Sequence, residues 1–206
     1  MSLESPEQPR PKGPRRRLLA DPLSLRALAH PLRLELQSII GREGKITAAA
    51  AARELGISQA LASHHLRQLA KYGFVEQSAG VDNRERPWQL VATSTSWQGL
   101  DETPEGAAAV AVLEQVIAER ALTNYLDWQE RRDSWSPGWR EHTGLGHSTI
   151  YLTEPEFAEL ARRIDALLTD YIEQRPLDDL SARPPDAVPV EMTLFAVPGE
   201  PTSSGN

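Results

Sequence analysis

The feature that most constrains the fold is a pair of short helical segments joined by three residues, within residues 47–72. Thr47 can cap an Ala-rich helix, TAAAAARELG, which ends at Gly56. Gly56, Ile57 and Ser58 connect it to a second helix, for which Ser58 is the expected N-cap. Two helices joined by a short turn that contains glycine have the outline of a helix-turn-helix. Other helical hairpins share this outline, so it needs support from its surroundings.

That support comes from the residues that follow. Residues 74–77 and 88–91 are rich in β-branched and aromatic types and are expected to form two short strands. The loop between them carries Arg84 and Arg86, so the predicted hairpin has a basic tip. A β-hairpin directly after the second helix makes the unit a winged helix, a combination that is far more specific than either part.

The helix expected over residues 58–72 has two different faces. At about 100° per residue, Ala62, Leu66 and Leu69 group on the side expected to pack on the core. The opposite side is polar and basic, and an α-helix with such a side fits the major groove, where it reads base edges and holds phosphates. The alternative is a solvated polar face. We predict DNA contacts from Ser58, Gln59, Ala60, Ser63, His64, Arg67 and Lys71 on the helix and from Arg84 and Arg86 on the hairpin.

The adjacent histidines His64 and His65 do not form a metal or catalytic site. They point about 100° apart on a helix, whereas a metal-binding pair needs the shared face of an i, i+4 spacing. No Asp, Glu or Cys lies at a ligand-compatible position on this helix, and no acid is spaced to orient a catalytic histidine next to Ser63. The sequence predicts that His64 is exposed, that His65 lies at the edge of the buried face, and that the protein is not an enzyme and holds no metal or cofactor.

The charge of the chain is unevenly distributed. The net charge is −7, but residues 1–100 carry 14 Lys and Arg against 9 Asp and Glu, and residues 101–206 carry 8 against 20. The basic half is the candidate for nucleic acid. The chain has no cysteine, no apolar run near the roughly 18 residues that span a bilayer, and no apolar N-terminal signal. We therefore expect a soluble cytoplasmic protein.

The sequence predicts a mainly α fold with small β content (α+β) in two domains. Residues 1–20 are expected to be a disordered basic tail, and residues 21–100 a winged helix-turn-helix domain in which Pro31 separates the first two helices. Residues 101–197 are expected to form a dimerisation or effector domain, followed by a disordered tail over residues 198–206.

A long helix and a strand–helix–strand unit are expected in the C-terminal half. Pro104 begins a helix that runs to about residue 133. Residues 147–153 and 188–196 are predicted strands on either side of an amphipathic helix that starts with a Thr153 and Glu156 capping box. The sequence leaves open whether these strands pair parallel or antiparallel.

The long helix has more apolar residues than one stripe requires, so part of it is expected to contact a second copy of the chain. The predicted dimer contacts are Leu113, Val116 and Ile117. Near the end of the helix, Tyr125, Trp128, Trp135 and Trp139 can line an apolar pocket. The sequence favours a core or dimer contact for these four, where Trp and Tyr are common, and keeps the pocket as the alternative.

The segment LRALAHPLRLELQSI, followed by TAAAAARELGISQALASHHLRQLAKYGFVEQ and the hairpin, resembles the ArsR family of winged helix-turn-helix repressors. The Ala-His-Pro-Leu-Arg and Ser-His-His-Leu runs carry most of the likeness, which covers about residues 22–92. The resemblance implies a homodimeric transcriptional regulator that binds a palindromic operator in double-stranded DNA and responds to a signal. It also implies that Ser58, Gln59, Ser63 and His64 lie in the base-contacting stretch and that Arg84 and Arg86 lie in the basic wing.

The chain departs from the metal-sensing members of that family. Those members bind metals through Cys, or His and Asp, on the helix before the turn or on the terminal helix. Here TAAAAARELG offers no ligand and residues 104–133 contain no histidine, while His142 and His147 are interpreted as ordinary polar residues. A metal sensor is therefore not expected. Two alternatives stay open: a winged-helix module that binds another protein, and a regulator whose C-terminal domain binds a small apolar ligand.

Overall fold

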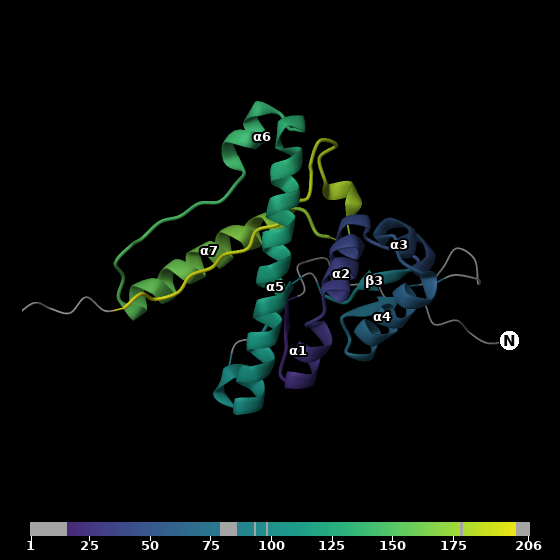
Figure 1. Ribbon diagram of the computed structural model, residues 1–206, viewed down its shortest axis with the longest axis horizontal. Coiled ribbons are helices and arrows are strands. Elements are labelled where there is room, and N and C mark those ends of the chain that lie inside the picture. The colour runs from purple at the N-terminus through teal and green to yellow at the C-terminus, as the bar shows by residue number, and fades with distance from the viewer. Residues whose placement is uncertain (1–15, 79–85, 93, 98, 178, 201–206) are drawn as a thin grey trace, which may run out of the picture.

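The computed structural model describes residues 16–78, 86–92, 94–97, 99–177 and 179–200 of the 206-residue chain. The protein is mainly α-helical with a small β content, as expected (Figure 1). The helices are α1 (Pro22–Leu28), α2 (Pro31–Glu43), α3 (Ala48–Leu55), α4 (Gln59–Lys71), α5 (Pro104–Arg131), α6 (Pro137–His142) and α7 (Glu154–Gln174). The strands are β1 (Arg16–Leu18), β2 (Val75–Gln77), β3 (Trp88–Leu90) and β4 (Ser94–Ser96), and the 3-10 turns are η1 (Leu100–Glu102), η2 (Arg132–Ser134) and η3 (Leu180–Ala182). In the described part of the chain, no helix is long and apolar enough to cross a membrane.

Local chemistry sets the ends of the N-terminal helices. Pro31 begins α2 directly after His30, whose Nδ1 accepts a hydrogen bond from the Leu32 amide at 3.1 Å. The Thr47 hydroxyl accepts a hydrogen bond from the α3 backbone at 3.2 Å and so caps that helix. α3 ends at Gly56, whose φ of 63° lies in the left-handed region that glycine adopts without steric cost. The expected separation of α1 from α2 and the expected ends of α3 are confirmed.

A single hydrophobic core is formed by the helices α1, α2, α3 and α4, the β2–β3 hairpin and the first half of α5. Its fully buried side chains include Leu25, Leu36, Ile40, Leu66 and Leu69. Ala109 and Leu113 of α5 belong to the same core, and α5 packs against α1. The boundary expected near residue 100 therefore does not separate two cores, because the first half of α5 completes the core of the N-terminal domain.

Two small two-stranded sheets border this core. β2 and β3 pair antiparallel, with Glu76 opposite Gln89, and form the expected hairpin. β1 pairs in parallel with β4, and the neighbouring Leu19 is only 1% exposed. The expectation of a disordered tail is therefore wrong for residues 16–20, because a strand pairing with a distant segment and a buried leucine hold them on the core. The rest of that tail, and residues 201–206 of the C-terminal one, lie outside the described residues.

The C-terminal part of the chain forms an arm that extends away from the core (Figure 1). α5 continues beyond the core, α6 follows near its end, and α7 projects to one side with an extended segment before and after it. The capping box of Thr153 and Glu156 is present at the start of α7, as expected, but no residue of α7 is buried.

Residues 147–153 and 188–196 do not form the predicted strands, so the strand–helix–strand unit is not formed. Alternating apolar residues indicate that a segment has one face to bury, but a strand also requires a hydrogen-bonded neighbour. In the described part of the chain neither segment has such a neighbour, and the alternating Val190, Met192 and Leu194 are all more than 60% exposed.

Candidate nucleic-acid interface

α4 is positioned by a short turn and by its own buried face. Three residues connect α3 to α4, and the Ser58 hydroxyl accepts a hydrogen bond from the Leu61 amide at 3.2 Å, which caps α4 as expected. The buried residues of the helix are Ala62, His65, Leu66 and Leu69. Because these residues pack toward α2 and α3, the opposite side of α4 is turned to solvent.

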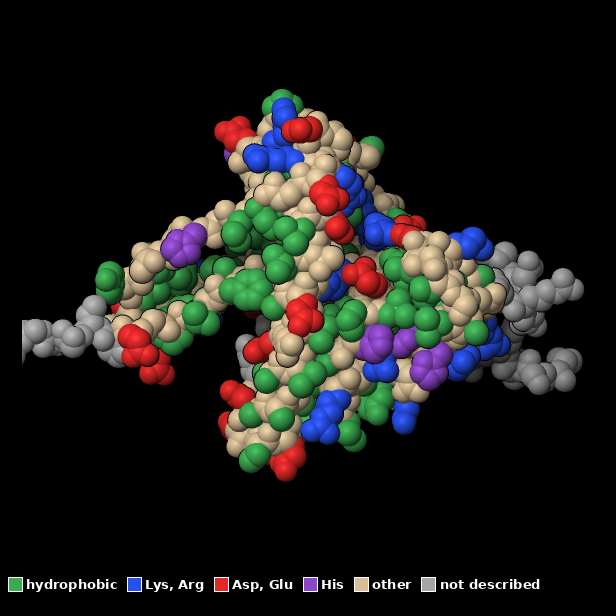
Figure 2. Space-filling model, viewed as in Figure 1, with side chains coloured by type: hydrophobic (Ala, Val, Ile, Leu, Met, Phe, Trp, Pro, Cys, Tyr) green, Lys and Arg blue, Asp and Glu red, His purple; other side chains and the backbone are tan. Residues whose placement is uncertain are grey.

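The α4 residues predicted to contact DNA lie together on this solvent side. Ser58, Gln59, Ala60, His64, Arg67 and Lys71 are exposed, and Ser63 is half-buried. Leu61 is 41% exposed among them and adds an apolar group of the kind that meets a thymine methyl. Arg67 forms no ion pair with a described residue. In Figure 2, histidine and basic side chains gather on this part of the surface, whereas many acidic side chains lie over α5 and the arm.

The adjacent histidines have different environments, as predicted. His65 is 6% exposed, its ring centre lies 4.6 Å from that of His30, and its Nδ1 lies 3.4 Å from Nε of Arg33. Burial, followed by the charges of His30, Arg33 and His64, lowers the pKa of His65 to about 4. His65 is therefore neutral at pH 7 and belongs to the packing between α2 and α4. His64 is exposed and is the histidine that an external group can reach.

The β2–β3 hairpin forms a wing beside α4. Nε2 of Gln89 donates a hydrogen bond to Oε1 of Glu76 at 2.9 Å, which links the two strands through their side chains. Arg86 is exposed just before β3. Arg84, the other predicted arginine of the hairpin tip, lies outside the described residues, so the structure places Arg86 alone.

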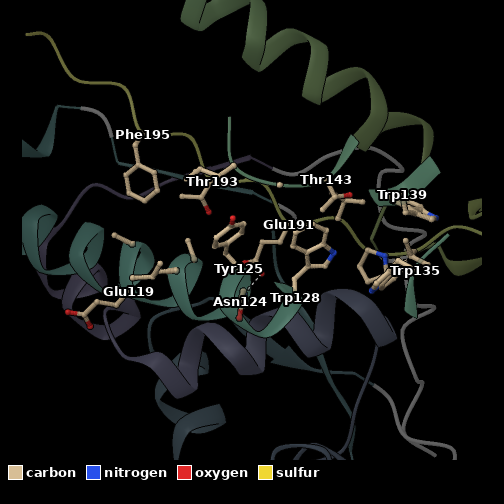
Figure 3. A pocket seen from close by; sticks show the side chains of 18 residues that line it. Glu119, Asn124, Tyr125, Trp128, Trp135, Trp139, Thr143, Glu191, Thr193 and Phe195 are labelled. Carbon is tan, nitrogen blue, oxygen red and sulfur yellow. Dashed lines mark hydrogen bonds between the residues drawn. The ribbon is translucent and has the colours of Figure 1, made fainter. Parts of the chain in front are cut away.

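The four aromatic residues predicted near the end of the long helix surround one cavity (Figure 3). Tyr125, Trp128, Trp135 and Trp139 line a space of about 740 Å³ between the second half of α5, the region of α6 and the segment after η3. Tyr125 stacks on Trp128 with ring centres 6.1 Å apart, and Trp135 meets Trp139 edge to face at 5.9 Å. None of the four is buried, so they do not belong to the hydrophobic core.

The residues predicted at a dimer interface do not share one environment. Leu113 is fully buried in the core of its own chain, so its side chain does not face a partner as predicted. The physical reason is that α5 packs on α1 through the face that carries Leu113. Val116 and Ile117 are half-buried. The large apolar side chains that α5 exposes are Val112, Leu122 and Leu126.

Sequence reasoning missed the arginine that joins α5 to both neighbouring elements. Arg120 donates from Nε to Glu35 of α2 at 2.6 Å and from Nη2 to Ser38 at 3.2 Å, and its Nη1 pairs with Glu191. Burial acts to lower the pKa of Arg120, but hydrogen bonds with Glu191 and Glu35 outweigh burial and raise it above its ordinary value. The one available signal was that Arg120 is the only basic residue of the long helix before Arg131.

Comparison with known families identifies one domain. The family model described as a helix-turn-helix domain matches residues 28–78, which contain α2, α3, α4 and β2. No curated protein sequence matches the chain.

Several solved structures are similar at low identity. A transcriptional regulator homologue from Pyrococcus horikoshii OT3 is 18% identical, with a TM-score of 0.31, over 48% of this chain and 91% of its own. The apo form of wild-type MarR from E. coli is 17% identical, with a TM-score of 0.29, over 71% and 89%. A MarR family protein from Mycobacterium tuberculosis, in complex with salicylic acid, is 18% identical, with a TM-score of 0.28, over 71% and 85%. The identification that stands is a helix-turn-helix domain, to which β2 and β3 add a wing.

Proposed function

We propose that this protein is a sequence-specific DNA-binding transcription regulator, a cytoplasmic repressor that acts as a homodimer and not an enzyme. The observation that carries the proposal is that α4 buries one face in the helix-turn-helix domain and presents Gln59, His64 and Arg67 on the other. α-Helices of this kind enter the major groove, where their N-terminal residues contact base edges. The resemblance to the ArsR family over residues 22–92 supports the repressor interpretation.

The placement of charge supports the same proposal. Arg67 and Lys71 follow the N-terminal residues of α4 by two and three turns, on the same exposed side, and Arg86 is exposed on the wing. Basic side chains in such positions hold phosphates on either side of the groove that the helix reads. A module that binds protein through the same face has no need of this set of cations, so the charges favour DNA.

The large exposed surface supports a dimer. A compact monomer of 22.8 kDa exposes about 9,600 Å², whereas this chain exposes 15280 Å². Allowing roughly 160 Å² for every residue outside the described ranges still leaves roughly 1,800 Å² more than a compact body of the remaining mass exposes. One partner of a standard interface buries about 800 Å². We place the interface on the arm, where Phe157, Leu168 and Tyr171 of α7 are exposed.

Fluorescence anisotropy tests the exposed face of α4. The labelled DNA is a fragment that the full chain selects from a random pool of sequences. Arg67→Ala should weaken binding by about five- to a hundredfold, which corresponds to the loss of one good base contact. Arg162→Ala removes an exposed arginine of α7 and is the matched control, which should bind as the unsubstituted chain does. If Arg67→Ala and His64→Ala both bind with unchanged affinity, α4 does not read DNA as proposed.

Sedimentation equilibrium tests the dimer. The charge introduced by Leu168→Glu should shift the full chain toward monomer, because it would be desolvated in an apolar interface. Glu173→Gln changes an exposed polar position of α7 and should leave the dimer intact. A dimer that withstands both Leu168→Glu and Tyr171→Glu would move the interface away from α7.

A further inference from the structure

The cavity beside the second half of α5 has the size of a small-molecule site. Its volume of about 740 Å³ lies within the range of about 300–1,000 Å³ typical of ligand pockets. Besides the four aromatic residues, its wall includes Leu122, Leu145, Val190 and Phe195, each more than half exposed. The cavity therefore presents apolar surface that a ligand would remove from water.

Aromatic rings and carboxylates share this wall (Figure 3). Tyr125 and Trp128 lie near Glu191 in the middle, Trp135 and Trp139 lie at one end, and Glu119 lies toward the other end with Phe195. The described residues that line the cavity include these two glutamates and no Lys or Arg.

The two carboxylates differ in how their charge is balanced. Glu191 pairs with Arg120 and accepts a hydrogen bond from Nδ2 of Asn124 at 2.7 Å. Glu119 accepts a hydrogen bond from the neutral Gln115 at 2.8 Å and forms no ion pair with a described residue. The negative charge of Glu191 is therefore balanced by Arg120, whereas that of Glu119 is not balanced by a described cation.

The aromatic rings and carboxylates of the wall favour a positively charged ligand over a negatively charged one. The face of an aromatic ring attracts a cation within about 6 Å of its centre, and Trp is the strongest partner. The site already contains one such contact, because the guanidinium of Arg132 lies 5.5 Å from the centre of the Trp128 ring. An anion would meet the carboxylate of Glu119, which no described cation pairs with, and would find no Lys or Arg among the described lining residues. We propose that the cavity binds a small apolar cation, of the quaternary ammonium or phosphonium class, between its aromatic rings.

The wall of the cavity is also tied to the helix-turn-helix domain. Glu191 accepts from Arg120, which holds α2 through two further hydrogen bonds. Earlier in the same segment, Arg183 donates to the last carbonyl groups of α2 at 2.5 and 2.9 Å. α2 in turn packs against α4. A cation bound near Glu191 competes with Arg120 for that carboxylate. Occupancy of the cavity therefore changes the contacts of Arg120, including its hydrogen bonds to α2. This regulatory consequence rests on the proposed function.

Equilibrium dialysis of the full chain, without DNA, tests the site with two probe ions. Tetraphenylphosphonium and tetraphenylborate have nearly the same size and shape and opposite charge. The full chain should bind the cation at least about tenfold more tightly than the anion, since the apolar wall favours both ions alike, whereas the aromatic faces and the carboxylate of Glu119 attract the cation and repel the anion.

Three variants localise the binding. Trp139→Ala removes an aromatic wall that is 38% exposed and should weaken cation binding by about three- to tenfold without unfolding the chain. Glu119→Gln should narrow the preference for the cation over the anion. The matched control for Glu119→Gln is Glu114→Gln, which lies on α5 outside the cavity. This control should change neither the affinity for the cation nor the affinity for the anion.

Equal affinity for the two ions overturns the proposed ligand class. Cation binding that neither Trp139→Ala nor Glu119→Gln weakens overturns the site, and so does the absence of cation binding. The same cation, added at saturation, should change affinity for the enriched DNA fragment at least threefold, with the reciprocal change in cation affinity. A cation that binds with no effect on DNA affinity refutes the coupling and leaves the ligand site standing.

Discussion

Acidification should destabilise the helix-turn-helix domain through the buried histidine of α4. Burial beside His30 and Arg33 lowers the pKa of His65 to about 4, against an ordinary value of 6.5. Between these two values the unfolded chain binds the proton and the folded chain does not, so the free energy of unfolding falls as the pH falls. From pH 7.5 to pH 5 the shift amounts to a loss of about 2 kcal/mol, which approaches about 3 kcal/mol below pH 4.

Urea unfolding of the full chain and of His65→Leu, at pH 7.5 and pH 5, measures this loss. Leucine fills a similar volume but cannot take up a proton. The variant therefore lacks the pH dependence that His65 causes and keeps the pH dependence of all other groups. His30, whose pKa is also lowered mainly by burial, and the carboxylates contribute in both proteins. Between pH 7.5 and pH 5, the free energy of unfolding of the unsubstituted chain should fall by about 2 kcal/mol more than that of the variant. Equal losses would refute the reasoning, because they would mean that His65 is free to ionise in the folded chain.

Further substitutions test the packing of α5, the cap of α3 and the hold on the C-terminal segment. Gly106→Ala should destabilise the fold by about 1–3 kcal/mol or more in urea unfolding, because its Cβ would lie 1.7 Å from a carbonyl oxygen of η1, whereas Gly138→Ala, with nothing within 4 Å, should be neutral. Thr47→Ala should cost about 1 kcal/mol by the same measurement, and no change would mean that its cap does not stabilise α3. Arg120→Gln should speed cleavage within residues 175–191 by thermolysin, which cuts before apolar residues such as Leu180, and an unchanged rate would show that this arginine does not hold the segment.

The helix-turn-helix unit was predictable because its signals are local. Thr47, Gly56 and Ser58 each act on backbone groups within three residues, so the ends of α3 and the start of α4 follow from residue type. The two faces of α4 follow from the helical repeat, which separates the buried His65 from the exposed His64 without knowledge of the neighbouring elements.

The C-terminal half was less predictable because its structure depends on distant contacts. The apolar alternation of residues 188–196 indicates a face to bury, but the sequence does not name the neighbour that a strand would need. The sequence shows that Leu113 is an apolar residue of the long helix, but it does not show what that residue contacts. Only the packing of α5 on α1 places Leu113 in the core of its own chain. The pairing of β1 with β4 likewise joins segments that local composition cannot connect.

Selection of DNA from a random pool by the full chain, at about 50 and about 200 mM salt, tests whether the protein recognises a specific DNA sequence. We expect enrichment of one inverted repeat with half-sites about 34–36 Å apart. Recovery of DNA should fall steeply as salt rises, because salt ions compete with the cations of α4 and the wing for the phosphates. Failure to enrich any sequence at either salt would contradict the claim that the exposed face of α4 reads DNA.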